Sequence, residues 1–359
     1  MENIMHKISK IILGLFIAVL IVWQVPWLYN FMTYAPQRSP FTLYSSVVNE
    51  FVYTIYKEGE GLCRYDESGN RYNEKEFDEV LPLFFVRQLT TDDRFPDKIG
   101  GVTIIPKQAQ MQNFVFRSIP SSLNKPEVGL YYLLESMSGR IDLSMPTDVF
   151  RFTNKGIEFV DANTNVIDLE KSVRFTEVMS SKGFSFPAQQ VVGDPNTRKD
   201  YDQGYLIKDG IGKLFQLKMV KGRPFVKHIE LPIGLDIKQL YITEYRGEKT
   251  LGFISAMDGK LYAIMNGSCE IKALDVPYFN PNREVITIFG NMFDWTVQIT
   301  SENKETYYAL DADTFKQIRT FSHQPEKVSF WEEWRNVLMP IRLSFTSSYD
   351  KWIYPRFNE

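Results

Sequence analysis

The amino-acid sequence predicts a mainly β protein, in which an N-terminal transmembrane helix precedes an irregular β-propeller-like domain. Three observations support this prediction: one long apolar run without a formal charge, many short strand-like runs between turn residues, and a loose internal repeat. A β-sandwich pair is the alternative all-β architecture, because any series of hairpins produces a similar pattern of turns and strands.

Composition describes a packed globular protein. The 359 residues are 44% hydrophobic, 24% charged and 14% aromatic, which excludes disorder as the main state. The net charge is −3, from 41 basic and 44 acidic side chains. Because nucleic-acid binding depends on neutralising phosphates, we expect no nucleic-acid partner.

The cysteine and histidine content argues against a metal site. The two cysteines, Cys63 and Cys269, and the three histidines form no spacing typical of zinc ligands. We therefore expect no bound metal and no cofactor. Whether the two cysteines pair depends on their geometry, which the sequence leaves open.

The apolar run near the N-terminus predicts a membrane anchor over residues 11–32. About 20 helical residues cross a hydrocarbon core of about 30 Å, and no formal charge interrupts this run. Aromatic side chains gather at its distal end, as is typical of a membrane interface. A cleaved signal peptide is the alternative, but the run lacks a small-residue cleavage site.

The basic residues around the anchor predict its orientation. Lys7 and Lys10 precede the run, whereas the next basic residue is Arg38. By the positive-inside rule, residues 1–10 form a cytoplasmic tail and the main domain lies in the periplasm or another extracytoplasmic space. The bilayer itself, at the inner membrane, is then one partner of the chain.

Residues 41–328 are predicted to form the β-rich extracytoplasmic domain. Four segments repeat a theme of turn, apolar strand, turn and charged strand, with turns near Gly156, Gly212, Gly259 and Lys304. Their spacings of roughly 45 to 56 residues are close to those of propeller blades.

Two segments are predicted to be helical. Residues 73–83 begin with Asn73 as a capping residue and an acidic first turn, and they end at Pro82. Residues 329–359 form a C-terminal aromatic amphipathic segment, which packs on the core or binds a partner or the membrane. The candidate partner or membrane stripe comprises Trp331, Trp334, Leu338 and Trp352.

No catalytic motif was found. Ser122 and Lys125 match half of a penicillin-binding signature whose other parts are missing, and the Asp161 turn lacks the glycine and glutamate of a calcium loop. We therefore predict no catalytic residues and a protein that is not an enzyme.

Several short phrases are spread along the body. They are Asp66-x-x-Gly69-x-x-Tyr72, Leu81-Pro82-Leu83, Arg87-Gln88-Leu89, Leu134-Glu135-Ser136, Asp148-x-Phe150-Arg151, Gly183-Phe184-x-Phe186-Pro187 and Lys199-x-Tyr201-Asp202-x-Gly204-Tyr205. By these phrases the body, over roughly residues 40 to 300, resembles a family of bacterial envelope proteins, found mainly in Bacteroides-like organisms and defined as a domain of unknown function. The resemblance implies an N-terminal anchor, no assigned activity, and genes placed beside ABC-transporter components.

The polar loop 193–204 is the candidate binding surface. Loops on rigid scaffolds often carry binding, and the alternative is a solvated connection with internal ion pairs. Arg174, Glu177 and Lys218 are further candidates for a functional face. The candidate loop residues are Asp194, Arg198, Lys199, Tyr201 and Asp202.

These observations favour a membrane-anchored, non-catalytic binding or accessory protein, associated with the membrane subunits of an ABC-type transport complex. The alternative is an envelope hydrolase with a carboxylate-based site in a propeller channel. Two facing carboxylates with separated pKa values would indicate the hydrolase.

Overall fold

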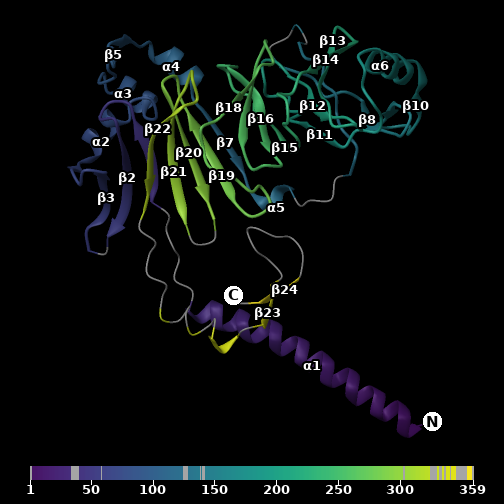
Figure 1. Ribbon diagram of the computed structural model, residues 1–359. Helices are drawn as coiled ribbons and strands as arrows, with labels where there is room; N and C mark the ends of the chain where they lie inside the picture. Colours follow the sequence, from purple (N-terminus) through teal and green to yellow (C-terminus); the bar gives the residue numbers. More distant parts are fainter. Residues whose placement is uncertain are drawn as a thin grey trace.

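The protein is described by a computed structural model that covers residues 2–33, 40–57, 59–123, 128–137, 139, 142–301, 304–323, 330, 334, 337–339, 341–344 and 354–357. Its main body is a row of antiparallel sheets above a single long helix (Figure 1). Five of the sheets have three or more strands. Most strands pair with the next strand in the sequence, which is the topology of successive propeller blades.

The strands of these five sheets have the following bounds. The first sheet contains β1 (Phe41–Ser45), β2 (Glu50–Lys57), β3 (Gly61–Asp66) and β4 (Arg71–Tyr72). The next contains β8 (Asp148–Phe152), β9 (Ile157–Asp161) and β10 (Ile167–Asp168). Two four-stranded sheets follow, with β11 (Gln190–Gly193), β12 (Tyr205–Lys208), β13 (Leu214–Val220), β14 (Arg223–Ile229), β15 (Ile237–Ile242), β16 (Thr250–Ala256), β17 (Leu261–Met265) and β18 (Ile271–Ala273). The last contains β19 (Val285–Gly290), β20 (Asp294–Thr300), β21 (Glu305–Asp311), β22 (Gln317–Ser322) and β7 (Phe114–Ser118).

The smaller elements lie mostly between the first sheet and β7 in the sequence. They are α2 (Glu74–Val80), α3 (Val86–Thr91), β5 (Lys98–Ile99), β6 (Val102–Thr103), α4 (Pro106–Gln112) and α5 (Pro120–Leu123). A longer helix, α6 (Leu169–Ser181), packs on β9 and β14.

Hydrophobic clusters fix the order of the sheets in space. Phe51 of the first sheet packs with Tyr307 of β21, and Trp295 of β20 packs with Phe253 of β16. Leu240 of β15 joins a cluster with β12 to β14, which in turn meets β8, β9 and α6 around Phe215. The row therefore runs from β1–β4 through β19–β22, β15–β18 and β11–β14 to β8–β10.

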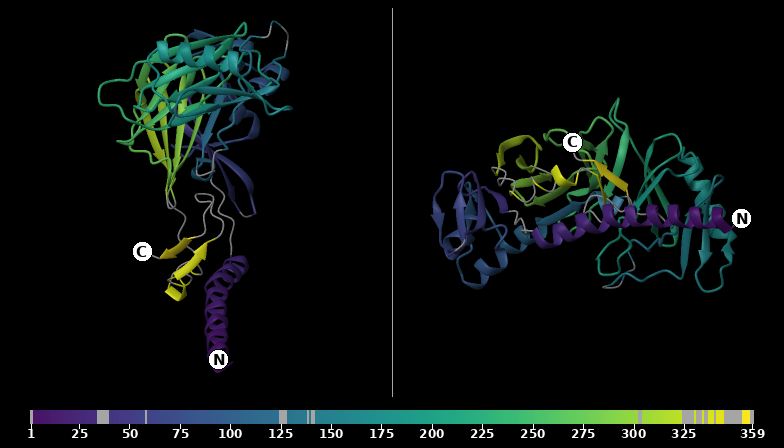
Figure 2. Two further views of the ribbon diagram at one scale, coloured as in Figure 1. Left: turned by 90° about the vertical axis from the view of Figure 1, so that its right-hand side faces the viewer. Right: turned by 90° about the horizontal axis from the view of Figure 1, so that it is seen from below.

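The two ends of this row stay apart. Figure 1 and the right-hand view of Figure 2 place β1–β4 and β8–β10 at opposite ends of the body. The fold is thus mainly β and propeller-like, as predicted, but its sheets do not close into a ring.

The strand β7 links the two halves of the sequence. It pairs with β19, so that Phe116 lies opposite Ile288 and a segment from the first third of the chain completes a sheet built by the last third. Phe114 and Phe116 are buried there against Phe253 and Trp295. Burial of these rings ties β7 into the centre of the row.

The predicted repeat corresponds to the last hairpin of four sheets. Its segments form β9–β10, β13–β14, β17–β18 and β21–β22. In three of them the connecting turn has the same geometry. Each contains one residue in the left-handed conformation, and the backbone amide of this residue donates to the carbonyl four residues earlier. The three residues are Asn165, Cys269 and Phe315. The repeat is therefore a structural unit rather than a chance similarity.

The predicted helix at residue 73 begins as expected. The Asn73 side chain accepts from the Glu76 amide, and the Glu76 carboxylate accepts from the Asn73 amide, which is a capping box. The helix α2 ends at Val80, two residues before Pro82, and places Phe77 and Val80 in the core.

The first helix, α1 (Glu2–Thr33), is long and apolar enough to cross a membrane over Ile4–Tyr29. Almost none of this segment is buried by the rest of the protein, so its apolar side chains face outward. A signal sequence near an N-terminus would have the same properties.

The α1 helix lies apart from the row of sheets, as Figures 1 and 2 show. A C-terminal hairpin of β23 (Ile341–Ser344) and β24 (Tyr354–Phe357) lies on the same side of the body, and β23 contacts α1. The C-terminal hairpin and α1 therefore lie together beneath the sheets, and the N-terminus lies at the far end of α1 (Figure 1).

Candidate functional site

A cavity of about 320 Å³ lies where the first sheet meets the sheet of β19–β22 and β7. Its walls come from the end of β1, the segment between α2 and α3, the start of β7 and the turn between β19 and β20. This volume is near the lower limit of small-molecule sites, which are roughly 300–1,000 Å³.

The cavity is mainly apolar, with polar groups contributed by few residues. Gly290 forms part of the wall, where a side chain would collide with the ring of Phe114. The apolar lining residues are Leu43, Val47, Val80, Leu81, Pro82, Leu83, Phe84, Ile99, Val115 and Phe289, and the polar ones include Ser45, Ser46, Asn113, Asn291, Asp294 and Thr296.

Asp294 is the one acidic residue among those that line the cavity, and it is 2% exposed. The Asn291 side-chain amide donates to its Oδ1 at 3.1 Å, and the Ser46 hydroxyl donates to its Oδ2. Within the described part of the chain, no lysine or arginine forms an ion pair with it. Burial raises the pKa of Asp294 to about 6, although both hydrogen bonds favour the ionised form.

Asn113 supplies a second acceptor in the same cavity. Its side-chain nitrogen donates to the Leu83 carbonyl, which fixes the orientation of the amide. Its Oδ1 is buried and accepts no hydrogen bond from any residue that the structure describes. A buried acceptor without a donor is costly, so a hydrogen bond from a ligand would stabilise it.

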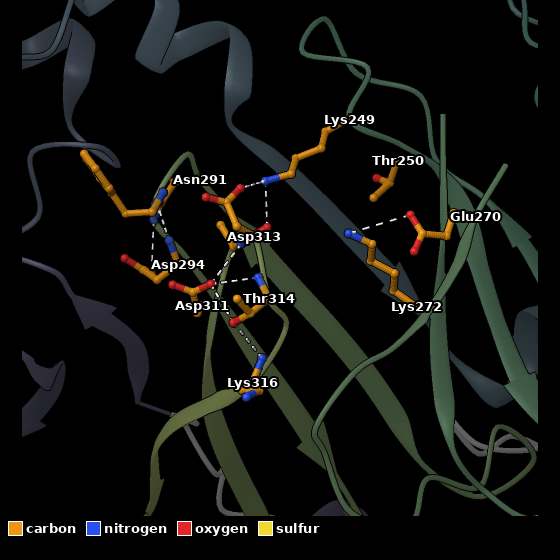
Figure 3. A network of polar contacts seen from close by, with 12 residues as sticks. Lys249, Thr250, Glu270, Lys272, Asn291, Asp294, Asp311, Asp313, Thr314 and Lys316 are labelled. Atoms are coloured by element: carbon orange, nitrogen blue, oxygen red, sulfur yellow. Dashed lines mark hydrogen bonds and ion pairs between the residues drawn. The ribbon is translucent and has the colours of Figure 1, made fainter. Parts of the chain in front are cut away.

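A hydrogen-bonded pair of turns holds Asp294 in place. Asp294 lies opposite Asp311 across β20 and β21, and the Asp311 carboxylate accepts from the Thr314 amide at 2.8 Å. Asp313, in the same turn as Asp311, accepts a hydrogen bond from Lys249 at 2.6 Å (Figure 3). Asp294 therefore stands on a rigid strand end rather than on a free loop.

The loop 193–204 turns two of its candidate residues inward. Lys199 forms ion pairs with Asp202, at 3.0 Å, and with Glu244, a residue outside the loop. All three side chains are at most 15% exposed. This arrangement requires glycine at position 204. Gly204 has a φ of +70°, and a side chain there would collide with the Leu217 carbonyl.

The titration of this trio follows from its burial. Burial raises the pKa of Glu244 to about 7 and raises the pKa of Asp202. Burial opposes the charge on Lys199, but its hydrogen bond to Glu244 and the charge of Asp202 raise its pKa. The two carboxylates share one lysine, so the three side chains form a single buried ion-pair cluster.

Two further contacts join candidate residues of the sequence. The Asp194 carboxylate lies 3.9 Å from the Lys199 Nζ, which also donates to the Asp194 carbonyl, and Tyr201 accepts a hydrogen bond from Lys218 at 3.1 Å. Arg198 is exposed. Arg174 and Glu177 are exposed on α6, away from the buried face of that helix.

The C-terminal stripe is described only in part. Trp334 and Leu338 are exposed, and Trp334 packs on Phe330 with 5.8 Å between ring centroids. Trp331 and Trp352 lie outside the described residues. The prediction that this stripe meets a partner or a membrane stays a prediction.

Sequence reasoning did not identify Asp294, Asn113 or Glu244. Asp294 gave one signal, since it directly precedes the apolar run of a strand that the structure buries. Cys63 and Cys269 are both buried and unpaired, which answers the question that the sequence left open. The described residues contain no cluster of histidine, cysteine and acidic side chains that would hold a metal ion.

Comparison with solved structures finds distant propellers. One is a structure of the Dos1 propeller, with 8% identity and a TM-score of 0.29, covering 49% of this chain and 45% of that one. This chain thus spans less than half the length of that protein. Another is the β-propeller domain of Cps50 (Swd1) from Myceliophteria thermophila, with 7% identity, a TM-score of 0.26, and coverage of 82% and 89%. The architecture described above rests on the strand pairing and hydrophobic packing of this chain.

No curated protein matches the sequence. A family model described as "Domain of unknown function (DUF4857)" matches residues 41–310, which begin with β1 and end in β21. This match covers most of the chain and nearly all of the row of sheets. The chain therefore belongs to the DUF4857 family.

Proposed function

We propose that this chain is a membrane-anchored, non-catalytic binding protein whose row of sheets lies outside the cytoplasm. The observation that supports it best is α1, which carries an exposed apolar surface along a length sufficient to cross a bilayer. Such a surface is unfavourable in water, and a bilayer covers it. Lys7 and Lys10 at its start favour a cytoplasmic N-terminus.

A binding role agrees with the polar groups of the body. The cavity has one acidic side chain among the described residues that line it, whereas acid–base catalysis generally uses two groups with separated pKa values in one pocket. The carboxylate pair at Asp202 and Glu244 is joined through Lys199 instead. These features favour binding over the hydrolase alternative.

We further propose an accessory role beside the membrane subunits of an ABC-type transporter. Two observations support this role: β23 contacts α1, and the side chains of Trp334 and Leu338, which precede β23, are exposed. A partner beside the anchor would be within reach of both segments.

Affinity purification of the full-length protein from native membranes, followed by mass spectrometry, tests this role. We expect transporter subunits to accompany the wild-type protein and to be lost from the double variant Trp334→Ala/Leu338→Ala. The matched control is Ile233→Ala, which removes an exposed apolar side chain between β14 and β15. Recovery of the protein without such subunits would reject the accessory role.

A further inference from the structure

We propose that the cavity between the first sheet and β19–β22 binds a small primary amine, with its ammonium group on Asp294 and its apolar body against Leu43, Leu83 and Phe289. This proposal rests on the proposed binding function and names its ligand class. The acceptor oxygens, the charge and the apolar side chains of the cavity lining favour this class of ligand.

Two residues of the cavity lining, Asp294 and Asn113, carry acceptor oxygens with unused hydrogen-bonding capacity. The Asp294 carboxylate receives one hydrogen bond on each oxygen, from Asn291 and Ser46, and an ionised carboxylate can accept about four. The Asn113 Oδ1 receives none within the described residues. A ligand that satisfies both groups must bring several donors, and an ammonium group has three.

Charge points to the same chemistry. Asp294 is 2% exposed and has no cationic partner among the residues that the structure describes. A buried carboxylate without a partner is unfavourable, and a bound cation would remove this cost. The acidic turns at Asp161 and Asp311, by contrast, are satisfied by their own threonines.

The remaining wall sets the shape of the ligand. Side chains from β1, the segment after α2 and β19 form a continuous apolar surface around the acid. The volume of about 320 Å³ fits a short alkyl or single-ring amine rather than a peptide.

Isothermal titration calorimetry of the full-length protein in nanodiscs of zwitterionic lipid, with empty nanodiscs as the blank, tests this inference. Hexylammonium is the probe, and hexanol has the same apolar body without the charge. We expect hexylammonium to bind the wild-type protein about tenfold or more tightly than hexanol, because hydrogen bonds to charged groups exceed neutral ones.

Two variants isolate the acid. Asp294→Asn should weaken hexylammonium binding about tenfold or more. Asp161→Asn is the matched control, because Asp161 ends β9 at the other end of the row and lies outside the cavity, and it should leave binding unchanged. Thermal unfolding of both variants verifies that they are folded. Absent binding of hexylammonium, or equal binding to wild type and Asp294→Asn, would overturn the inference.

These outcomes are separable from those of the proposed function. A protein that recovers transporter subunits but binds no amine would retain its accessory role and lose the ligand assigned here. A protein that binds hexylammonium but recovers no subunits would remain a membrane-anchored binding protein without that partner.

Discussion

Single buried charges control the stability of this protein at the residue scale. Lys199 forms ion pairs with both Asp202 and Glu244, whose side chains are largely buried. Removing one member of such a cluster leaves uncompensated charge in a poorly solvated site. The loop 193–204 is therefore held to the body by its lysine.

Replacing Lys199 with methionine tests this conclusion. We expect Lys199→Met to lower the free energy of unfolding by about 3–5 kcal/mol, as is typical when a buried ion pair loses one partner. Arg198→Met is the matched control, because Arg198 is exposed, and it should change stability by less than about 0.5 kcal/mol. Denaturant unfolding measures both, and equal losses would contradict the role given to Lys199.

Asp294 has the opposite effect on stability. Its folded-state pKa of about 6 lies above the ordinary value of 3.8, because burial disfavours the carboxylate. Between these values the folded protein holds a proton that the unfolded chain has lost. Ionisation of Asp294 therefore destabilises the fold progressively as the pH rises from about 4 to above 6.

Asp294→Asn should remove this penalty. The asparagine can accept from Asn291 and donate to the Ser46 hydroxyl, so both contacts survive. We expect the variant to be more stable than the wild type at pH 7.5, by up to about 3 kcal/mol, and the difference to vanish near pH 4. Thermal unfolding measured across this pH range checks the trend. A difference that grows toward low pH would refute it.

At the scale of elements, β7 is the strand on which the connected row depends. It joins residues 114–118 to the sheet of β19–β22, and Phe116 contacts Tyr241 and Phe253 of the neighbouring sheet. This burial links the first third of the chain to the centre of the body, in addition to the packing of Phe51 on Tyr307.

The variant Phe116→Ala measures this link. We expect a loss of about 3–5 kcal/mol in the free energy of unfolding, as is typical when a buried phenylalanine is removed from a core. Arg117→Ala, at the next position of the same strand, changes an exposed side chain and is the control. A loss below about 1 kcal/mol for Phe116→Ala would show that β7 contributes little.

The sequence predicted those elements whose signals are local. The capping box at Asn73 and the hairpins around Gly212 and Gly259 required only nearby residues. The turns at Cys269 and Phe315 were less evident, because these residues occupy a left-handed conformation that usually favours glycine or asparagine.

The candidate site could not be predicted in the same way. The walls of the cavity come from segments around residues 43, 83, 113 and 294, which only tertiary folding brings together. The pairing of Lys199 with Asp202 is local, but its pairing with Glu244 crosses two sheets. Periodicity identifies strands and buried faces, whereas a cavity depends on how those faces meet.

For the whole molecule, the central feature is the separation of a row of sheets from an exposed apolar helix. The body is propeller-like and open. The strands β1, β19 and β20, which line the cavity, belong to sheets toward one end of the row, and β11 and β12, which flank the loop 193–204, lie toward the other (Figure 1). The α1 helix and the C-terminal hairpin lie together beneath it. This arrangement is suited to a binding domain tethered at a membrane surface.

Cysteine accessibility tests the anchored topology most directly. Ile233→Cys places a thiol on a fully exposed turn of the body, and His6→Cys places one before the apolar run. The native thiols of Cys63 and Cys269 are buried, so the wild-type protein is the unlabelled control. In bacterial cells with a permeabilised outer membrane, we expect a membrane-impermeant maleimide to label Ile233→Cys and to label His6→Cys only after lysis with detergent. Labelling of His6→Cys alone in unlysed cells, or release of the Ile233→Cys protein from the membrane at alkaline pH, would contradict the account of this chain as a membrane-anchored extracytoplasmic binding protein.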